Sequence, residues 1–399
     1  MNVCYVSTFY PESVTTADEM LARWPLLRRL PPALVSHGHQ VTVLAHAGAS
    51  DVRDLDGANY EFVNPGPVAR SVAGIIHRWK PRYGPAYYLP AFHIVRHLRQ
   101  LRPDVVHFAG LTLDLHLALV ARECRRQSIP LVVHFHGGVP DRGRLRRIQH
   151  WNAANVDRVL VTTLEQGEPW VSVGDLRADQ LVEVVESSSP FAGMPRREAQ
   201  TLTGMVGDPV YLSAGRLDAI KDPLTMLRAF ERISAVQRDA RLYLYYLTDE
   251  LLNDIVAFLD ARPDLAERVA LRGRAPLDEM EAIYSSADVL LQASTREWSG
   301  LAVIEAMSCG CIPIVTDIPS FRKITDHGRV GRLVPVGDAN AMAKAALALT
   351  ASERGPLSAA AREHFAESLS FDAMARAISG VYVEVVEARR GLDRVGRVQ

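Results

Sequence analysis

Long apolar runs are missing from this 399-residue sequence. None reaches the roughly 18 consecutive apolar residues that a membrane-spanning helix needs. The first residues, MNVCYVSTFYP, also lack the basic start, the long apolar centre and the small-residue cleavage site of a signal peptide. We interpret them as a β-strand, and the sequence therefore predicts a cytoplasmic protein with no transmembrane segment.

Cysteine is scarce as well. The chain has four cysteines, Cys4, Cys124, Cys309 and Cys311. Thiols so few and so scattered exclude a disulfide framework and a four-ligand zinc site. A reduced protein fits this cysteine content.

Net charge is nearly absent, because 45 Lys and Arg face 46 Asp and Glu. No overall field attracts nucleic acid, so we expect no nucleic-acid partner, and any anion must bind locally. One local candidate is the basic cluster Arg142, Arg144, Arg146 and Arg147. A solvated helix start explains it, and peripheral contact with an anionic membrane or recognition of a phosphorylated acceptor are the alternatives.

The chain contains 48% apolar and 23% charged residues, an ordinary globular mixture whose length predicts two or three domains. Short β-branched runs alternate with amphipathic stretches in both halves, which is typical of parallel βαβ units. A polar segment rich in Pro, Gly and Ser, from about 186 to 208, interrupts this alternation as a linker does. The sequence therefore predicts two Rossmann-like, doubly wound α/β domains, residues 1–190 and 191–374, facing each other across a cleft.

The pattern predicts strands and helices along both halves. The expected strands lie at 3–7, 40–45, 105–108, 131–135, 159–162, 181–185, 210–214, 241–247, 269–271, 289–292 and 312–315. The expected helices lie at 20–36, 89–101, 111–127, 223–234, 251–261, 277–286, 302–308, 339–349 and 371–387. Residues 389–399 are expected to be a frayed, charged end.

One segment, QASTREWSGLAVIEAMSCGCIPIVTD (292–317), combines acidic residues with a turn between a strand and a helix. The N-terminus of such a helix offers unpaired N–H groups to an anion, and Gly300 permits close backbone approach. Glu305 lies one turn inside the helix, where its carboxylate can accept hydrogen bonds from a ribose diol. Glu297 lies in the preceding loop, placed to meet the other end of the same ligand.

A second segment, SAGRLDAIKD (213–222), places Arg216 and Lys221 in a loop between a strand and a helix. A guanidinium and an ammonium group suit a diphosphate that is held and then stabilised as it leaves. Most cations in loops are merely solvated, which is the alternative. Both segments follow strands of one predicted sheet, so their side chains are expected at the same edge, and this favours the binding site.

The segments GRLDAIKD, YSSADVLLQAS and EWSGLAVIEAMSCGCIPI together resemble the retaining glycosyltransferases of family 4, over residues 213–317. The resemblance implies the GT-B fold and transfer of a sugar from a nucleotide diphosphate sugar to an acceptor hydroxyl, with retention of anomeric configuration. It implies no metal and no cofactor. The acceptor would be a small molecule, a lipid or a glycan, in carbohydrate or natural-product biosynthesis. A C-terminal helix at about 375–395 is expected to pack back on the first domain.

The resemblance also implies roles for individual residues. The catalytic residues it implies are His136, Arg216, Lys221 and Glu297, of which Arg216 and Lys221 bind the pyrophosphate and Glu297 contacts the transferred sugar. The donor-binding residues it implies are Gly273 and Arg274 near the base, Ser299, Gly300 and Leu301 at the phosphates, and Glu305 at the ribose.

His136 belongs to the segment VVHFHGG, in which strand alternation puts His134 and His136 on one face. By resemblance, His136 contacts the transferred sugar, and His107 shapes the floor of the cleft. A metal-binding His pair and a purely structural histidine are the alternatives.

The chain departs from the family in three places. The loop after the first strand carries no glycine between Phe9 and Met20, so its acceptor or phosphate contacts would come from Glu12, Ser13, Thr15 and Thr16. Trp298 and Ser299 stand where Gly and Phe are usual, and Trp298 either walls the sugar pocket or has a plain packing role. The linker lacks the usual Asn-Gly-Val-Asp.

A further feature is an aromatic segment with Trp79, Tyr83, Tyr87, Tyr88 and Phe92. It either lines an acceptor groove or packs a loop onto the first domain.

Two other functions fit parts of this pattern. One is another GT-B enzyme, such as a phosphorylase or a nucleotide-sugar epimerase. The other is a non-catalytic protein that binds a nucleotide or sugar. The presence of both Glu297 and Glu305 argues against the non-catalytic reading.

Overall fold

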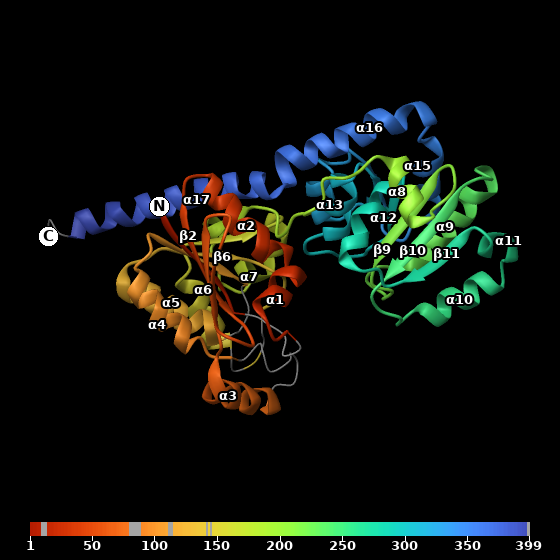
Figure 1. Ribbon diagram of the computed structural model, residues 1–399. Coiled ribbons are helices and arrows are strands. Elements are labelled where there is room, and N and C mark those ends of the chain that lie inside the picture. Colours follow the sequence, from red (N-terminus) through yellow and green to blue (C-terminus); the bar gives the residue numbers. More distant parts are fainter. Residues whose placement is uncertain (9–13, 80–88, 111–114, 141–142, 144–145, 397–399) are drawn as a thin grey trace. The chain divides into compact units, whose positions relative to one another are not determined.

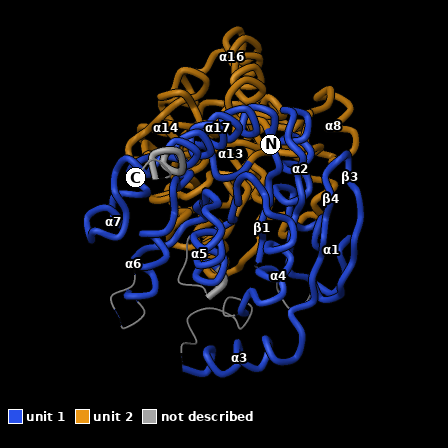
Figure 2. Tube along the Cα trace, turned by 90° about the vertical axis from the view of Figure 1, so that its left-hand side faces the viewer, with its two compact units in different colours: residues 1–187, 371–399 blue, residues 188–370 orange. Residues whose placement is uncertain are grey.

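The computed structural model describes residues 1–8, 14–79, 89–110, 115–140, 143 and 146–396. The chain divides into two compact units, which Figure 2 draws in different colours. Unit 1 comprises Met1–Ser187 and Phe371–Gln399, and unit 2 comprises Ser188–Ser370. The C-terminal segment therefore belongs to the same unit as the N-terminus.

Unit 1 is built on an eight-stranded sheet in the order β3-β4-β2-β1-β5-β6-β7-β8. Its strands are β1 (Asn2–Ser7), β2 (Gln40–His46), β3 (Asp51–Leu55), β4 (Ala58–Val63), β5 (Val105–Ala109), β6 (Leu131–His134), β7 (Arg158–Val161) and β8 (Leu181–Glu183). β1 lies between β2 and β5 and pairs in parallel with both. β3 runs antiparallel to β4. The chain thus adds strands on both sides of β1, as a doubly wound sheet does.

Helices cover this sheet (Figure 1). They are α1 (Ala17–Arg23), α2 (Pro25–Ser36), α3 (Gly66–Trp79), α4 (Phe92–Leu101), α5 (Leu115–Gln127), α6 (Arg146–Ala154), α7 (Leu164–Ser172) and α17 (Phe371–Gly396), with a short 3-10 turn at Ala178–Gln180. α17 packs beside α2. Two histidines join it to the N-terminal part: His37 pairs with Asp372 at 2.9 Å, and His39 hydrogen-bonds Ser379 at 2.8 Å.

Unit 2 is built on a six-stranded sheet of parallel strands in the order β11-β10-β9-β12-β13-β14. The strands are β9 (Val210–Gly215), β10 (Arg241–Tyr246), β11 (Val269–Gly273), β12 (Val289–Gln292), β13 (Ile312–Thr316) and β14 (Arg332–Val334). The helices are α8 (Arg196–Thr203), α9 (Pro223–Val236), α10 (Leu252–Asp260), α11 (Pro263–Ala266), α12 (Met280–Ser286), α13 (Leu301–Ser308), α14 (Pro319–Ile324), α15 (Ala339–Ala348) and α16 (Ala351–His364), with further turns at Leu277–Glu279 and Phe365–Leu369.

The helix α9 shows why these residues form this element. Pro223 occupies its first turn, and the Asp222 carboxylate accepts the N–H of Thr225 as an N-cap. Its apolar residues recur at the spacing of one helix face, so Met226, Phe230 and Ile233 are buried against the sheet together with α15. This packing holds the loop before α9 at the carboxyl end of β9.

The structure confirms the predicted alternation of strands and helices and corrects it in several places. The segment 20–36, expected as one helix interrupted by prolines, is two helices: α1 ends at Arg23 with Trp24 as its C-cap, and Pro25 begins α2. The hairpin β3–β4 and helix α3 were not expected. α8 occupies part of the segment taken for a linker. α17 continues to Gly396 instead of fraying from 389.

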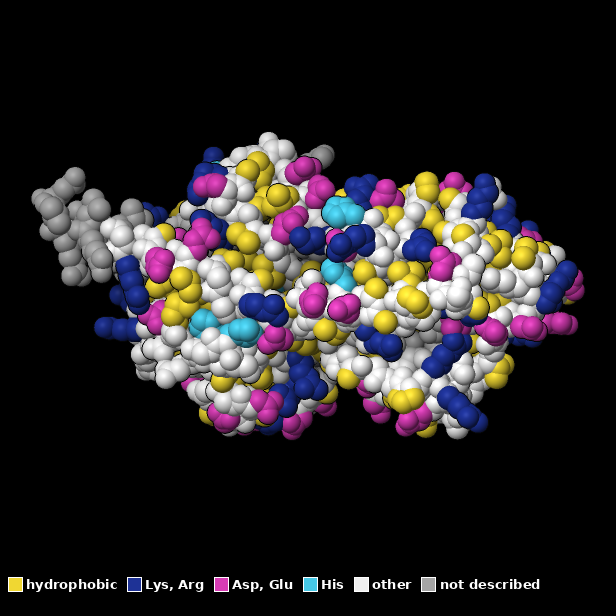
Figure 3. Space-filling view, turned by 90° about the horizontal axis from the view of Figure 1, so that it is seen from above, with side chains coloured by type: hydrophobic (Ala, Val, Ile, Leu, Met, Phe, Trp, Pro, Cys, Tyr) yellow, Lys and Arg dark blue, Asp and Glu magenta, His cyan; other side chains and the backbone are white. Residues whose placement is uncertain are grey.

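The surface carries both signs of charge. On the face drawn in Figure 3, Lys and Arg side chains lie among Asp and Glu side chains. Of the helices within the described ranges, none has the length and apolar character needed to cross a membrane.

Candidate functional site

The order of the strands in unit 2 defines where a ligand binds. β10 lies on one side of β9 and β12 on the other, so the order of addition reverses between β9 and β12. Open α/β sheets bind ligands at the carboxyl ends of strands beside such a switch point. The loops that leave the sheet there are 216–222 and 293–300, which contain both sequence motifs.

The first loop is ordered by Asp218. Its Oδ1 accepts the N–H groups of Ile220 and Lys221, each at 3.0 Å. Its Oδ2 lies 2.6 Å from Nε of Arg216, whose side chain is about half exposed. Asp218 therefore holds the turn that presents both predicted cations. Sequence reasoning missed this role, although Asp218 stands inside the quoted GRLD segment.

The second loop is joined to the first. The backbone N–H of Thr295 donates to the carbonyl of Ile220 at 2.7 Å. The ammonium group of Lys221 forms an ion pair with Glu297, and both side chains are mostly buried. The same Glu297 oxygen accepts a hydrogen bond from Ser294 at 2.8 Å. The two motifs, 76 positions apart at this contact, therefore form one site.

Gly215 lies beside this contact. Its φ of 151° is a backbone conformation that other residues rarely adopt, whereas a Cβ there would make only ordinary contacts, 3.5 Å from Cε of Lys221 and 3.7 Å from Nε2 of Gln292. Gln292 donates from that nitrogen to the carbonyl of Ala214 at 3.0 Å, which joins the ends of β9 and β12. Gln292 is a second residue that the sequence analysis did not assign to the site.

Gly300 sets the start of α13. It adopts a left-handed conformation with φ of 62°, and it is the N-cap of the helix. A Cβ there would lie 2.6 Å from Cδ1 of Ile324. Ser299 and Leu301, on either side, are half-buried. The first N–H groups of the helix thus point from a narrow turn, the geometry that suits an anion.

Glu305 lies on the second turn of α13 and is 9% exposed. Its Oε2 accepts a hydrogen bond of 2.8 Å from the hydroxyl of Tyr284, which α12 supplies. Burial raises the pKa of Glu305 to about 7, and the Tyr284 hydrogen bond acts in the opposite direction. Tyr284 is a third residue that the sequence analysis did not assign to the site, although it begins the quoted segment YSSADVLLQAS.

Gly273 and Arg274 lie at the carboxyl end of β11, two strands from β9. Gly273 has φ of 66°, and a Cβ added to it would meet no atom within 4 Å. Arg274 is exposed. Both lie at the same edge of the sheet as Lys221 and Glu297, and their place at the base stays a prediction.

The remaining predicted residues belong to unit 1. Glu12, Ser13, Arg142, Arg144, Tyr83, Tyr87 and Tyr88 lie outside the described residues. Thr16 caps α1, where its hydroxyl accepts the N–H of Glu19, and Thr15 hydrogen-bonds the Glu19 carboxylate at 3.1 Å. His136 pairs with Glu186 at 3.2 Å. Their contacts to sugar or acceptor stay predictions.

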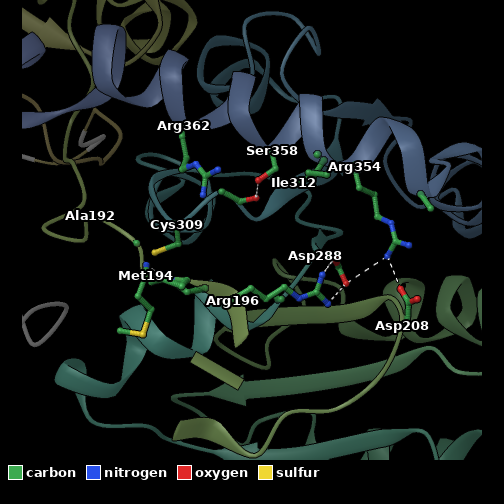
Figure 4. A pocket seen from close by; sticks show the side chains of 17 residues that line it. Ala192, Met194, Arg196, Asp208, Asp288, Cys309, Ile312, Arg354, Ser358 and Arg362 are labelled. Atoms are coloured by element: carbon green, nitrogen blue, oxygen red, sulfur yellow. Dashed lines mark hydrogen bonds and ion pairs between the residues drawn. The ribbon is translucent and has the colours of Figure 1, made fainter. Parts of the chain in front are cut away.

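Unit 2 also has a cavity away from these two loops. Its volume is about 700 Å³, and it lies at the opposite edge of the sheet, where β9, β12 and β13 begin. Figure 4 shows Arg196, Arg354 and Arg362 among its lining residues, with Asp288 between Arg196 and Arg354 and Asp208 on the other side of Arg354. The first two arginines are already paired with these carboxylates. Chemistry therefore favours the switch point, where cations, a helix start and acidic residues converge.

Metal ligands do not cluster in the described ranges, since no three His, Cys, Asp or Glu side chains there are arranged to hold an ion.

Comparison with known families agrees with this geometry. The description "Glycosyl transferases group 1" matches residues 208–352, and "Glycosyl transferase 4-like domain" matches residues 24–184. The two matches together span more than half of the chain. The chain belongs to the group 1 glycosyltransferases.

Two relatives illustrate how this glycosyltransferase compares with characterised proteins. D-inositol 3-phosphate glycosyltransferase of Saccharomonospora viridis is 29% identical over 60% of the chain, and the match spans 58% of that relative's length. Phosphatidyl-myo-inositol mannosyltransferase of Mycobacterium leprae is 24% identical over 80% of the chain and 84% of its own length.

Solved structures share the GT-B fold of this glycosyltransferase. Sucrose-phosphate synthase of Thermosynechococcus elongatus has a TM-score of 0.68 and 18% identity over 97% of this chain and 99% of its own. HepE of Anabaena, in complex with UDP, has a TM-score of 0.67 and 14% identity, and the match covers 96% of this chain and 99% of HepE.

Proposed function

We propose that this glycosyltransferase transfers a sugar from a nucleotide diphosphate sugar to an acceptor hydroxyl, with retention of anomeric configuration and without a metal ion. The observation that carries the proposal is the ion pair of Lys221 with Glu297 beside Arg216 at the switch point. A cation for the diphosphate and a carboxylate for the sugar are thereby placed next to each other.

The charges of the site support metal-independent transfer. As the bond to the sugar breaks, negative charge develops on the departing diphosphate. Arg216, Lys221 and the N-terminus of α13 supply the positive charge that a divalent cation supplies in other transferases. Lys221 is held by Glu297 and is mostly buried, so it meets the phosphate in a place where charges interact more strongly than in water.

The rest of the donor has matching groups. We propose that Glu305 accepts hydrogen bonds from the ribose diol and that Gly273 and Arg274 border the base. Solved structures of HepE are complexes with UDP and with UDP-glucose, and several relatives are named mannosyltransferases. These names support a nucleotide diphosphate hexose as donor. The acceptor would be a small molecule, a lipid or a glycan with a free hydroxyl.

Thermal unfolding tests the donor site. We expect one nucleoside diphosphate of a panel (UDP, GDP, ADP, dTDP) to raise the melting temperature without magnesium, because a ligand that binds the folded state stabilises it by mass action. Arg216→Ala should abolish this rise. Arg197→Ala, an exposed arginine on α8 at the other edge of the sheet, is the matched control and should retain it.

Turnover tests the reaction itself. The substrate is the sugar derivative of the nucleoside diphosphate that raises the melting temperature. With it, Lys221→Gln and Glu297→Gln should each lower the rate of sugar transfer, or of slow donor hydrolysis where no acceptor is present, at least about 100-fold. NMR of the product should show the anomeric configuration of the donor. Stabilisation without any turnover would favour a non-catalytic binding protein, and inversion or a strict need for magnesium would contradict the proposed mechanism.

A further inference from the structure

The end of β6 in unit 1 holds two stacked histidine rings. The ring centroids of His134 and His136 lie 5.2 Å apart, with 28° between the planes. His134 is fully buried, and its Nε2 lies 3.1 Å from the carbonyl of Val185. A carbonyl only accepts, so this nitrogen of His134 carries a proton. The ring of His136 therefore rests against a neighbour that is itself held in place.

The residue after Val185 is Glu186, where the linker lacks the Asn-Gly-Val-Asp of the family. Its backbone N–H donates to Oγ1 of Thr162 at 3.1 Å. Its Oε1 lies 3.2 Å from Nδ1 of His136, and its side chain is 13% exposed. Its other oxygen, Oε2, is buried and has no hydrogen-bond partner among the described residues.

This contact decides which nitrogen of His136 is protonated. An ionised carboxylate can only accept, so the proton of a neutral His136 ring lies on Nδ1. Nε2, on the opposite side of the ring, then keeps its lone pair. The side chain of His136 is 29% exposed, so the ring is accessible to a ligand.

The fold alone gives no reason for a carboxylate at position 186. A mostly buried carboxylate with one oxygen unsatisfied costs free energy, and an amide or a small apolar residue would avoid that cost. Such a group persists where its chemistry is used.

We propose that Glu186 is a positioning residue, which holds His136 in the Nδ1–H tautomer so that Nε2 accepts a hydrogen bond from a hydroxyl of the transferred sugar. The inference rests on the proposed function, because it assumes that His136 meets the sugar. Glu186 itself acts only through His136.

The pair is tested first without any reaction. In 15N NMR spectra of the full-length protein labelled at histidine, His136 should show a protonated Nδ1 and an unprotonated Nε2. Glu186→Ala should mix in the other tautomer, and His136→Ala assigns the signals. A wild-type ring with the proton on Nε2 would overturn the proposal, whether or not the protein transfers sugar.

Kinetics then test the consequence. Glu186→Ala should lower kcat about 10- to 100-fold, as a mispositioned group does, while stabilisation by the nucleoside diphosphate stays unchanged. Glu186→Gln keeps an oxygen acceptor and should recover most of this loss. In the His136→Ala background, Glu186→Ala should cost nothing more, because the two residues act as one.

The control is a second His–carboxylate pair in unit 1. Glu61 lies 2.6 Å from His97, with similar exposure of both side chains. Glu61→Ala should leave kcat unchanged. Losses that add up in the double variant Glu186→Ala/His136→Ala would overturn the positioning role. A correct tautomer together with normal turnover in His136→Ala would show that the assumed contact of His136 with the sugar fails, while the pair itself stands.

Discussion

At Glu305, a single buried carboxylate lowers stability at the position where we propose that the donor ribose binds. The carboxylate lies in the core side of α13, beneath the hydroxyl of Tyr284. Its folded-state pKa, about 7, is above the ordinary value of 4.5 because burial disfavours the charge. Ionised Glu305 is therefore a cost to the folded state at neutral and higher pH. A ribose diol that donates two hydrogen bonds to it would offset that cost.

Glu305→Gln should accordingly stabilise the protein and weaken the binding of the donor. The rise of the pKa from 4.5 to about 7 corresponds to about 3 kcal/mol, a cost absent below pH 4.5 and fully present above pH 7. At pH 8 the free energy of unfolding of unit 2 in urea should rise by about this amount. At pH 5 it should change little. Loss of stability at pH 8, or unchanged stabilisation by the nucleoside diphosphate, would contradict this reading of Glu305.

At the scale of elements, the start of α13 depends on one glycine. Gly300→Ala combines a left-handed backbone with a Cβ that collides with Ile324. We expect a loss of about 1–3 kcal/mol in urea unfolding and weaker binding of the nucleoside diphosphate. Gly355→Ala is the matched control, because this glycine lies within α16 and a Cβ there meets nothing within 4 Å. It should be neutral or stabilise by up to about 1 kcal/mol. Equal effects of both variants would contradict the expectation.

The opposite edge of the same sheet is held by a charged network. Asp288 directly precedes β12. Its carboxylate accepts hydrogen bonds from both terminal nitrogens of Arg196 on α8 and from the backbone N–H of Val210, the last at 2.7 Å. Arg354 of α16 lies 3.6 Å from Asp288 and pairs with Asp208 at 2.8 Å (Figure 4). Two helices are thus tied to the starts of β9 and β12 through one buried carboxylate.

Asp288→Asn should therefore destabilise unit 2. Removing the charge leaves Arg196 without its ionised partner. Because the carboxylate is buried while the Arg196 side chain is 39% exposed, we expect a loss of about 2 kcal/mol. The loss of unfolding free energy is measured by urea unfolding, followed by the fluorescence of Trp298 in unit 2. Glu231→Gln removes the half-exposed pair with Arg262 and should cost less than about 1 kcal/mol. A loss for Asp288→Asn as small as that of Glu231→Gln would show that the network contributes little.

At the scale of the whole molecule, buried groups of the two units with strongly shifted pKa values respond to acid in opposite directions. In unit 1, burial lowers the pKa of His46 to about 4 and that of His107 to about 3. These rings are neutral in the folded unit and bind protons when it unfolds. Each therefore stabilises the fold above pH 6.5, and that contribution is lost as the pH falls toward the folded-state pKa. In unit 2, protonation of Glu305 relieves a cost as the pH falls.

Unit 1 should consequently open first in acid. Between pH 6.5 and pH 5, His46 and His107 should each remove about 2 kcal/mol from the stability of unit 1. Hydrogen exchange, corrected for the intrinsic effect of pH, should show protection lost from β1, β5 and β6 at pH 5 before β9 and β12. His46→Gln keeps a donor for the carbonyl of Thr8, 3.0 Å from Nδ1 of His46, and should reduce this sensitivity. Earlier loss of protection in unit 2 would contradict the assignment.

Much of this protein can be predicted from the order of residues along the chain. β-branched runs and helix-spaced apolar residues are local features, so the strands and helices of both sheets are predictable from them. The loops 216–222 and 293–300 follow strands of one parallel sheet, so their meeting at one edge is predictable too. β3 was missed because three of its five residues, DVRDL, are charged, and β4 was missed although its apolar and polar residues alternate. α8 was missed because its polar sequence resembles a linker.

The sequence by itself determined the two parallel α/β sheets and the family motifs, because spacing within a strand, a turn or a helix is encoded by neighbouring residues. Only the tertiary structure decided which polar and charged side chains meet. Lys221 finds Glu297, Tyr284 covers Glu305, Glu186 reaches His136, and Tyr382 hydrogen-bonds His107 from 275 positions away. These contacts depend on strand order and on where helices return to the sheet. They are set by the packing of the whole core, which no local pattern specifies.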